Sequence, residues 1–482
     1  MRDERKFYIG GQWVRSVEGV DRAVINPSTE ERCAVISLGG KADTNAAVAA
    51  AKAAFTGWSR SSRADRLDLM RSILDIYIRR SAEMGEAISL EMGAPVDLAK
   101  GLQTGIGQVH IEAFIRALEC FEFERPLGAD TPNDRILYEP IGVCGLITPW
   151  NWPMNQVTLK VIPALASGCT MVLKPSEEAP LSSLLFAEYM DEAGVPAGVF
   201  NLVNGDGAGV GSQLTAHEDV DLISFTGSTR AGQIITKSTA DTVKRVVLEL
   251  GGKGANIVFE DADENAVSRG ALHCFENTGQ SCNAPTRMLV HRSRYESAVE
   301  EARQAAGAQA VDLAVKTGGH IGPAVNEAQF NRIQDMIARG VEEGAQLVAG
   351  GPGKPEGLSR GYFVRPTVFA GCTNDMTVMQ QEIFGPVLSI MPFDTEEEAI
   401  KIANDTSFGL TNYVQTQDPE RANRVARQLR SGMVEMNGNF RTAAAGAPFG
   451  GYKQSGNGRE GGVWGLEDFM EVKLVGGWNP GA

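Results

Sequence analysis

A single cysteine lies in the polar segment "FENTGQSCNAPTR" (residues 275–287). Most isolated cysteines lie in apolar stretches and pack as small hydrophobic side chains, whereas Cys282 lies between Ser281 and Asn283. Its thiol has three possible roles, namely an inert core group, a metal ligand or a nucleophile. No Cys/His spacing in the chain is typical of a zinc site, so metal binding is disfavoured. The segment by itself leaves the core thiol and the nucleophile open.

Three other segments hold side chains that could do chemistry or bind a cofactor. "TPWNWP" places Asn151 between two tryptophans and two prolines. A rigid amide can donate to an oxyanion, although an asparagine that serves its own turn is the commoner case. "LELGGK" places Glu249 after an apolar run, where a carboxylate either forms a salt bridge or is tuned as a base. "QEIFGP" offers Glu382 and Phe384 at a similar strand entry.

Two glycine turns could hold phosphate, because helix N-termini present free N–H groups and a positive dipole end. They are "GDGAGVG", with Gly205, Gly207 and Gly211, and "FTGSTRAG", with Gly227 and Ser228 before a helix. The first is one residue longer than the usual dinucleotide fingerprint, and each is weak evidence alone.

The segment "KPSEE" follows a predicted strand and bears on the choice of cofactor. A carboxylate at a strand end, here Glu177, can accept from both ribose hydroxyls, which favours NAD over NADP. Lys174 could bind a ribose hydroxyl or tolerate a 2′-phosphate. The alternative for both residues is a solvated, charged turn.

Short β-prone runs alternate with helical segments and would position these groups. Between residues 140 and 250 this alternation predicts βαβ units and a doubly wound parallel sheet, and a second α/β region runs from about 253 to 445. Residues 61–93 predict one long amphipathic helix that begins at a serine and ends near Gly93. The tail "FMEVKLVGG" predicts a strand that needs a partner, which another subunit could provide.

Composition narrows the classes of function. The 482 residues carry a net charge of −15 and the pI is near 5.0, so nucleic-acid and anionic-membrane partners are disfavoured. The N-terminus lacks an apolar signal segment, and no apolar run approaches the roughly 20 residues of a membrane span. Seven scattered cysteines without CxxC pairs favour a reduced, cytoplasmic protein.

Taken together, the motifs resemble the aldehyde dehydrogenase superfamily. The ordered series is "TPWNWP", "KPSE", "FTGST", "LELGGK", "GQSC", "EIFGPV" and "PFGGYKQSGNGRE", which spans residues 148 to 460. Any single motif could arise by chance, but the series in this order and spacing is specific. The resemblance implies that Cys282 is the nucleophile, that Glu249 is the general base and that Asn151 contributes to the oxyanion hole.

The resemblance also implies a set of binding residues and no metal. Cofactor contacts are expected from Thr148, Pro149, Trp150, Lys174, Ser176, Glu177, Gly207, Gly211, Phe225, Thr226, Gly227, Ser228, Leu250, Gly251, Glu382 and Phe384. Lys160 and Glu460 match residues sometimes assigned to proton relay.

The family's fold implies three parts in this α/β chain. A doubly wound, parallel-sheet NAD(P)-binding domain is expected from residues 1–122 and 142–251, and an α/β catalytic domain from 252–445. A small β oligomerisation flap is expected from 123–141 and 462–482, which implies a dimer or a tetramer.

The resemblance implies oxidation of an aldehyde to a carboxylic acid with NAD, or NADP, through a thiohemiacetal and a thioester on Cys282. Relatives that release acyl-CoA typically lack the glutamate, so Glu249 predicts hydrolysis to the free acid. The alternatives are a dehydrogenase of the same family specific for a semialdehyde or an aminoaldehyde, and a nicotinamide-binding protein without turnover.

The substrate is less well determined by these residues. Ser281 and Asn283 are small and polar, while Trp152 and Phe449 are expected as apolar walls of the aldehyde tunnel. Glu276 stands where many relatives have an apolar or aromatic residue, and it would favour a cationic aminoaldehyde. Arg441 would instead bind the carboxylate of a semialdehyde, so the two hints oppose each other. Either side chain could also turn to solvent.

Overall fold

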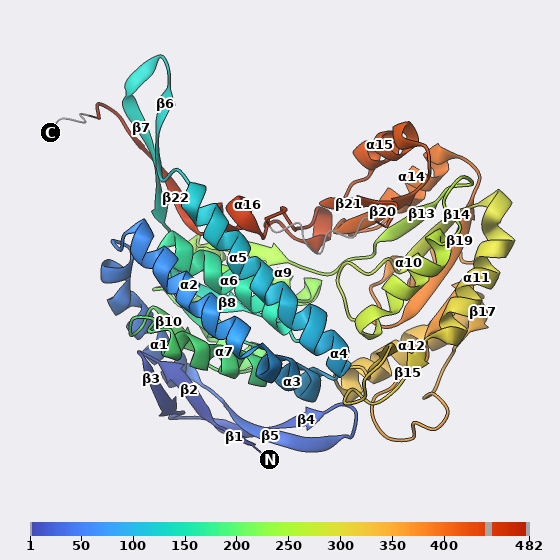
Figure 1. The fold of residues 1–482 in the computed structure, drawn as a ribbon, viewed down its shortest axis with the longest axis horizontal. Helices are drawn as coiled ribbons and strands as arrows, with labels where there is room; N and C mark the ends of the chain where they lie inside the picture. The colour runs from blue at the N-terminus through green and yellow to red at the C-terminus, as the bar shows by residue number, and fades with distance from the viewer. Residues whose placement is uncertain (1, 439–445, 479–482) are drawn as a thin grey trace.

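Two α/β units lie side by side, and a β arm projects from the first of them (Figure 1). This computed structural model describes residues 2–438 and 446–478. Each unit is built on a seven-stranded sheet, and the arm is a three-stranded sheet. The predicted α/β class with a doubly wound parallel sheet and a second α/β unit is confirmed.

The first sheet has five parallel strands and an antiparallel N-terminal hairpin, which the sequence did not predict. Its order is β12 (Arg245–Glu249), β11 (Leu222–Thr226), β8 (Val143–Ile147), β9 (Thr170–Lys174), β10 (Phe200–Leu202), β2 (Lys6–Ile9) and β3 (Gln12–Arg15). Helices cover both faces and bury separate apolar clusters against them. One face carries α1 (Lys41–Trp58), α8 (Ser212–Ala216) and α9 (Thr229–Ser238), and the other carries α6 (Pro153–Ser167) and α7 (Leu181–Glu192).

The second sheet is parallel except at its β17 edge. Its order is β17 (Gln346–Ala349), β18 (Thr367–Ala370), β19 (Val387–Phe393), β14 (Arg287–His291), β13 (Ala255–Val258), β20 (Thr411–Gln415) and β21 (Met433–Met436). Its helices are α10 (Ala266–Phe275), α11 (Tyr295–Ala308), α12 (Glu327–Glu342), α13 (Thr377–Gln380), α14 (Glu396–Asn404) and α15 (Pro419–Gln428). The two sheets are consecutive in the chain, because β13 begins six residues after β12 ends.

The arm joins a hairpin to the C-terminal tail. It consists of β22 (Met470–Val475), β7 (Thr131–Pro140) and β6 (Glu124–Gly128) in that order, all antiparallel. The tail therefore is a strand, as predicted, but its partner on one side is β7 of its own chain. Its other edge has no partner strand among the described residues.

The predicted single helix over residues 61–93 is wrong, because the chain breaks it at Arg80. It forms α2 (Arg63–Arg79), capped by Ser62, and α3 (Ser81–Met92), which ends at left-handed Gly93. Arg80 has φ −103° and ψ 15°, and its guanidinium pairs with Glu83 and Glu188 and stacks on Tyr189. These tertiary contacts override a helical pattern that runs without interruption in the sequence.

The remaining elements connect and brace the two units. They are β1 (Arg2–Glu4), β4 (Val20–Asn26), β5 (Glu31–Leu38), α4 (Val96–Leu98), α5 (Thr104–Cys120), β15 (Ala310–Val311), β16 (His320–Ile321) and α16 (Gly462–Glu467). No described helix is both long enough and apolar enough to cross a bilayer.

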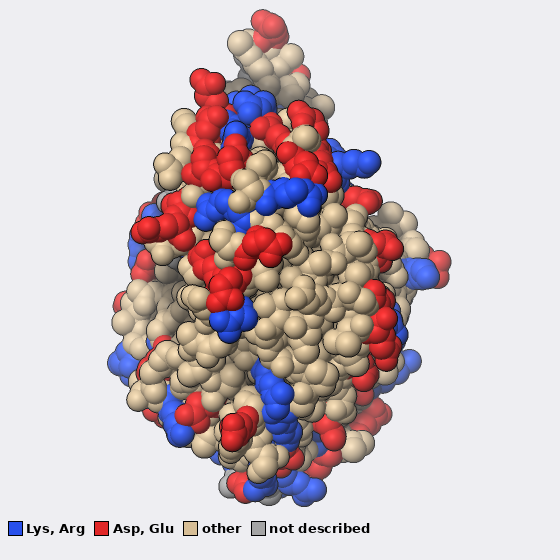
Figure 2. All heavy atoms as spheres, turned by 90° about the vertical axis from the view of Figure 1, so that its right-hand side faces the viewer, with Lys and Arg blue, Asp and Glu red and all other residues tan. Residues whose placement is uncertain are grey.

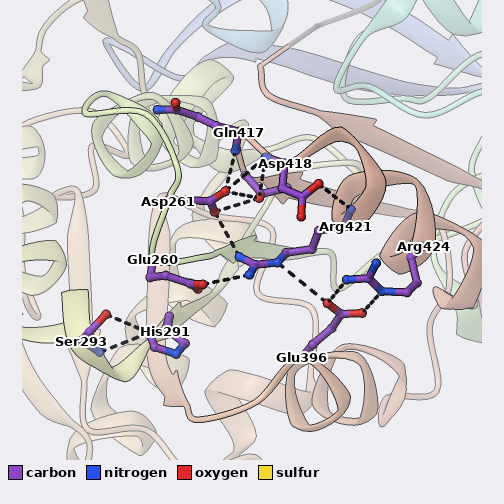
Figure 3. A network of polar contacts seen from close by, with 10 residues as sticks. Glu260, Asp261, His291, Ser293, Glu396, Gln417, Asp418, Arg421 and Arg424 are labelled. Atoms are coloured by element: carbon purple, nitrogen blue, oxygen red, sulfur yellow. Dashed lines mark hydrogen bonds and ion pairs between the residues drawn. The ribbon is translucent and has the colours of Figure 1, made fainter.

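An ion-pair network holds α15 against the ends of β13 and α14. Arg421 lies between Glu260 at 2.9 Å, Asp261 at 3.2 Å and Glu396 at 3.9 Å (Figure 3). Asp261 also accepts hydrogen bonds from the Thr416 hydroxyl at 2.8 Å. Because each charge meets an opposite one, the network ties the loop after β20 to the sheet. Figure 2 shows the right-hand side of the molecule in Figure 1, where Lys and Arg side chains lie among Asp and Glu towards the top of the view.

Candidate active site

A left-handed turn presents Cys282 directly after α10. Asn277, Thr278 and Gly279 have φ of 51°, 59° and 66°, a region that side chains other than asparagine and glycine rarely adopt. A Cβ atom on Gly279 would lie 2.1 Å from the carbonyl oxygen of Gly385, so only glycine fits there. The "GQSC" segment therefore packs directly on "EIFGP", and Cys282 is left half-buried.

The Asn151 side chain is locked to the cysteine turn. The side-chain Nδ2 of Asn151 donates to the backbone carbonyl oxygen of Gln280 at 3.0 Å. The backbone carbonyl oxygen of Asn151 accepts a hydrogen bond from Nδ2 of Asn277 at 3.0 Å. The side chain is buried and serves another segment, not its own turn. Asn277 and Gln280 are positioning residues that the sequence prediction missed. An asparagine before a glycine, both suited to left-handed backbone, was the available signal.

The two glycines of "LELGGK" allow the site to close. A Cβ atom on Gly252 would lie 2.3 Å from the Cys282 carbonyl oxygen, and one on Gly251 would lie 2.3 Å from Oε2 of Glu382. The Gly252 N–H donates to Oε1 of Glu382 at 2.8 Å. Burial raises the pKa of Glu382 to about 7. The nucleophile turn and the Glu382 segment thus meet at these two residues.

Glu249 ends β12 with 1% of its surface exposed. Neither of its carboxylate oxygens has a hydrogen-bond partner among the described residues. Burial, and then the like charge of Glu460, raise its pKa well above the ordinary value, while Lys160 opposes the shift. A buried, unpaired carboxylate is unusual and is typical of a tuned base.

Lys160 and Glu460 form a buried ion pair beside Glu249. Nζ of Lys160, on α6, donates to Oε1 of Glu460, and the two side chains are 1% and 5% exposed. The pair joins the helix that follows Asn151 to the C-terminal loop. The charges of both members of the pair also act on Glu249.

Replacing Lys160 by methionine is expected to destabilise the fold by about 3–5 kcal/mol, because Glu460 is left buried without its partner. Denaturant unfolding measures the loss. Lys237→Met, on the exposed face of α9, is the control and should stay within about 0.5 kcal/mol of the parent. An unchanged unfolding midpoint for Lys160→Met would show that the pair contributes nothing.

The Cys282 thiol is protonated in this arrangement. Burial raises its pKa to about 12, and the charges of Glu382 and Glu249 contribute in the same direction. Ionisation therefore needs a base or an added positive charge nearby. The charge of Glu249 influences the thiol, and Glu249 has a raised pKa itself.

A cavity of about 1160 Å³ opens at Cys282. Five of the residues predicted for substrate binding lie in the described part of the chain, and all five line this cavity. They are Trp152, Glu276, Ser281, Asn283 and Phe449. Trp152 Nε1 donates to the Ser281 hydroxyl at 2.8 Å, which fixes the wall beside the nucleophile. Arg441 lies outside the described residues.

Three helix faces line part of the cavity. They contribute Leu98, Leu102, Ile106 and His110 from the α4–α5 region, Trp152, Asn155, Gln156 and Leu159 from the start of α6, and a face of α10. The α4–α5 wall was missed by the sequence prediction, although its spacing of four residues indicates one helix face.

Most of the predicted cofactor residues lie at or just after the carboxyl ends of β8, β9, β10, β11 and β12, while Glu382 and Phe384 lie between α13 and β19. Ser228 caps α9 through Ala231 N at 3.3 Å, Ser176 accepts from Glu178 N at 3.2 Å, and Trp150 meets the Phe384 ring edge-on at 5.4 Å. Leu250 packs on the Gly232 turn of α9. The hydroxyls of Thr148 and Thr226 are buried without a described partner, so donors and acceptors remain for a polar ligand. Ligands of doubly wound sheets bind at this edge.

The two glycine turns differ in their fitness for phosphate. Residues 207–211 form one wide turn, whose N–H at Gly209 is already capped by the Asp206 carboxylate, and the helix that follows has only five residues. The ten-residue α9 is capped by neutral Ser228 instead. A pyrophosphate suits the α9 end better, because no carboxylate occupies it.

Lys174 is satisfied by the protein itself. Its ammonium donates to the carbonyls of Pro175 at 2.9 Å and Gly205 at 2.6 Å and to Glu177 at 3.3 Å. These contacts use its three N–H groups. Glu177 keeps a partly exposed carboxylate, with 23% of its side chain accessible, so it is the better placed of the two to meet a ribose.

Comparison with known proteins agrees with this geometry. The model of the aldehyde dehydrogenase family matches residues 13–475. The chain is 52% identical to the 3-succinoylsemialdehyde-pyridine dehydrogenase of a Pseudomonas species over 99% of both chains. The chain belongs to the aldehyde dehydrogenase family.

Solved aldehyde dehydrogenases share the fold throughout. The enzyme of Bartonella henselae is 56% identical, with a TM-score of 0.98 over 99% of this chain and 100% of the other. A mutant aldehyde dehydrogenase C of Pseudomonas syringae, crystallised with NAD+ and octanal, is 48% identical, with a TM-score of 0.96 over 99% and 98%. This aldehyde dehydrogenase is therefore an NAD(P)-dependent oxidoreductase that acts on aldehyde groups, as the motif series predicted.

Proposed function

We propose that the thiol of Cys282 attacks the aldehyde carbon and that the aldehyde leaves as a carboxylic acid. The observation that carries this assignment is that Cys282 lines the cavity while its turn is hydrogen-bonded to Asn151 and packs against the Glu382 segment. A tetrahedral thiohemiacetal places negative charge on oxygen. The second N–H of the Asn151 amide and the Cys282 backbone N–H are the donors proposed for it, and one such donor is typically worth about 10²–10³ in rate.

The remaining steps need a hydride acceptor and a base. When bound, NAD(P)+ accepts the hydride that the thiohemiacetal loses. The acyl group stays on Cys282 as a thioester. Glu249 is the proposed base that takes a proton from water as the water attacks the thioester, which releases the acid and restores the thiol. The charges of Lys160 and Glu460 influence the pKa of Glu249.

The cofactor is proposed to lie across the α9 end and the Glu382 segment. Glu177 would accept from the adenosine ribose, Ser228 would meet pyrophosphate, and Glu382 would bind the nicotinamide ribose beside Phe384. Lys174 orders Glu177 and the Gly205 turn. We propose NAD as the preferred form, because the Glu177 carboxylate would repel a 2′-phosphate.

NADH formation from a panel of aldehydes, with NAD and NADP side by side, tests the function. Glu177→Gln is expected to raise the ratio of kcat/KM for NADP over NAD roughly tenfold, because one repulsive charge is removed. Glu178→Gln is the matched control, since that carboxylate pairs with Arg22. A ratio that does not move would remove Glu177 from the ribose site, and inactivity on every aldehyde would reject the proposed reaction.

The domain roles follow from the same geometry. We propose that residues 1–122 and 142–251 bind the cofactor, that 252–445 carry the nucleophile, and that the arm, residues 123–141 with the tail from 462, assembles a cytoplasmic homodimer or homotetramer. Val472 and Leu474 of β22 are 61% and 60% exposed and lie on one face of that strand. Exposed apolar residues beside an unpaired strand edge favour contact with another copy.

The double change Val472→Lys and Leu474→Lys is expected to lower the oligomeric state, because two charges then face the proposed interface. Sedimentation velocity measures the assembly. Val341→Lys, 45% exposed on α12, is the control and should leave it unchanged. A parent protein that sediments as a monomer would refute the proposed role of the arm.

A further inference from the structure

One face of α10 forms part of the wall of the cavity that opens at Cys282. Asn265, Ser268, Arg269, Leu272, His273 and Glu276 recur at helical spacing, and all of them line the cavity. Glu276 precedes Cys282 by six positions, and Cys282 lines the same cavity. Glu276 and the thiol therefore face the same substrate cavity.

The Glu276 carboxylate is a half-buried acid without a described partner. It makes no hydrogen bond or ion pair with another described residue, and burial is the one influence on its pKa, which is raised. A charge held in partial burial without a counter-ion is costly unless a ligand supplies one.

The backbone reinforces the negative potential at this point. Glu276 is the residue at which α10 ends, where the free carbonyls form the negative end of the helix dipole. His273, in the last turn, does not offset this, because burial lowers its pKa to about 4 and leaves the imidazole neutral at neutral pH.

No described positive charge on the cavity wall balances the acid. Among the described lining residues, Arg269 is the sole Lys or Arg. Its guanidinium is engaged by Asp263 at 3.0 and 2.7 Å and by Gln415 at 2.9 Å. His110 is neutral too, since burial lowers its pKa to about 4.

Apolar side chains form other parts of the wall, among them Leu98, Leu102 and Ile106 and the aromatic Trp152 and Phe449. Aromatic faces attract cations as well as apolar chains. The cavity thus combines room for an apolar body with an acid, Glu276, that has no described counter-charge.

We infer that Glu276 is a specificity residue that selects aldehydes bearing a cationic nitrogen group beyond an apolar spacer, over neutral aldehydes and over semialdehydes ending in a carboxylate. The inference rests on the proposed reaction at Cys282 and adds a substrate class to it.

A matched set of three probes tests the inference. They are a trimethylammonio alkanal, its uncharged tert-butyl isostere and a carboxyalkanal of similar length, each assayed with NAD. In the parent enzyme, kcat/KM is expected to be at least tenfold higher for the cation than for the isostere, chiefly through KM, and lowest for the carboxylate. Glu276→Gln is expected to bring the cation within twofold of the isostere while the isostere keeps its parent value.

Glu264→Gln is the control variant, because it removes the same charge from an exposed position just before α10. It should leave the ratios unchanged. Equal kcat/KM values for cation and isostere in the parent, a preference for the carboxylate, or a cation preference that survives Glu276→Gln would each overturn the inference. Activity on the isostere shows that the preparation is folded, and no NADH from any probe would instead reject the proposed reaction.

Discussion

Cys282→Ala is expected to lower NADH formation by about 10⁴-fold or more. Without the thiol, no tetrahedral adduct forms, and an aldehyde cannot release hydride without one. The structure gives no substitute nucleophile at this place, because Ser281 is bound to the Trp152 indole and Asn283 carries an amide. Steady-state NADH formation with a reactive aldehyde measures the loss.

Cofactor binding should survive in Cys282→Ala, since the proposed cofactor contacts lie on other segments. Titration of NAD against the variant's fluorescence checks this. Cys274→Ala is the matched control, because that thiol is buried in α10 and donates to the Val387 carbonyl, away from the cavity wall. Substantial activity in Cys282→Ala would dismiss the thiol as the nucleophile.

Glu249→Gln is expected to slow turnover by about 10²–10⁴-fold, because the thioester then lacks its base for hydrolysis. Hydride transfer precedes that step, so the variant should show a burst of NADH close to one per active site, followed by a slow phase. Rapid-mixing kinetics separates the two phases. Slow NADH formation without any burst would indicate that Glu249 acts before hydride transfer.

The raised pKa of Glu249 predicts the direction in which kcat changes with pH. A base must be ionised to work, and this pKa is raised, so kcat should be low at acidic pH and rise as pH passes through the raised value. Lys160 opposes the upward shift, so Lys160→Met should move the rise to higher pH. A pH profile that Glu249→Gln leaves unchanged would contradict this assignment.

Several elements follow from local sequence alone. The parallel strands of the first sheet were predictable because short apolar runs alternate with helical patterns bounded by glycine. The helix over 61–93 was not, because its break at Arg80 depends on partners that lie more than 100 residues away on α7. The phosphate turn at Gly207 was ambiguous for a similar reason, since its cap by Asp206 is visible once the turn is folded.

By itself, the sequence determined which groups are proposed to carry the chemistry, because the family resemblance of the ordered motifs implies Cys282, Glu249 and Asn151. Tertiary structure decided what those groups meet. Asn151 and Gln280 are 129 positions apart yet hydrogen-bonded, and Lys160 meets Glu460 across 300 positions. Burial, pairing and cavity shape arise from such distant contacts, so the unpaired state of Glu249 and the exposure of Glu276 to the cavity could be decided by the folded chain alone.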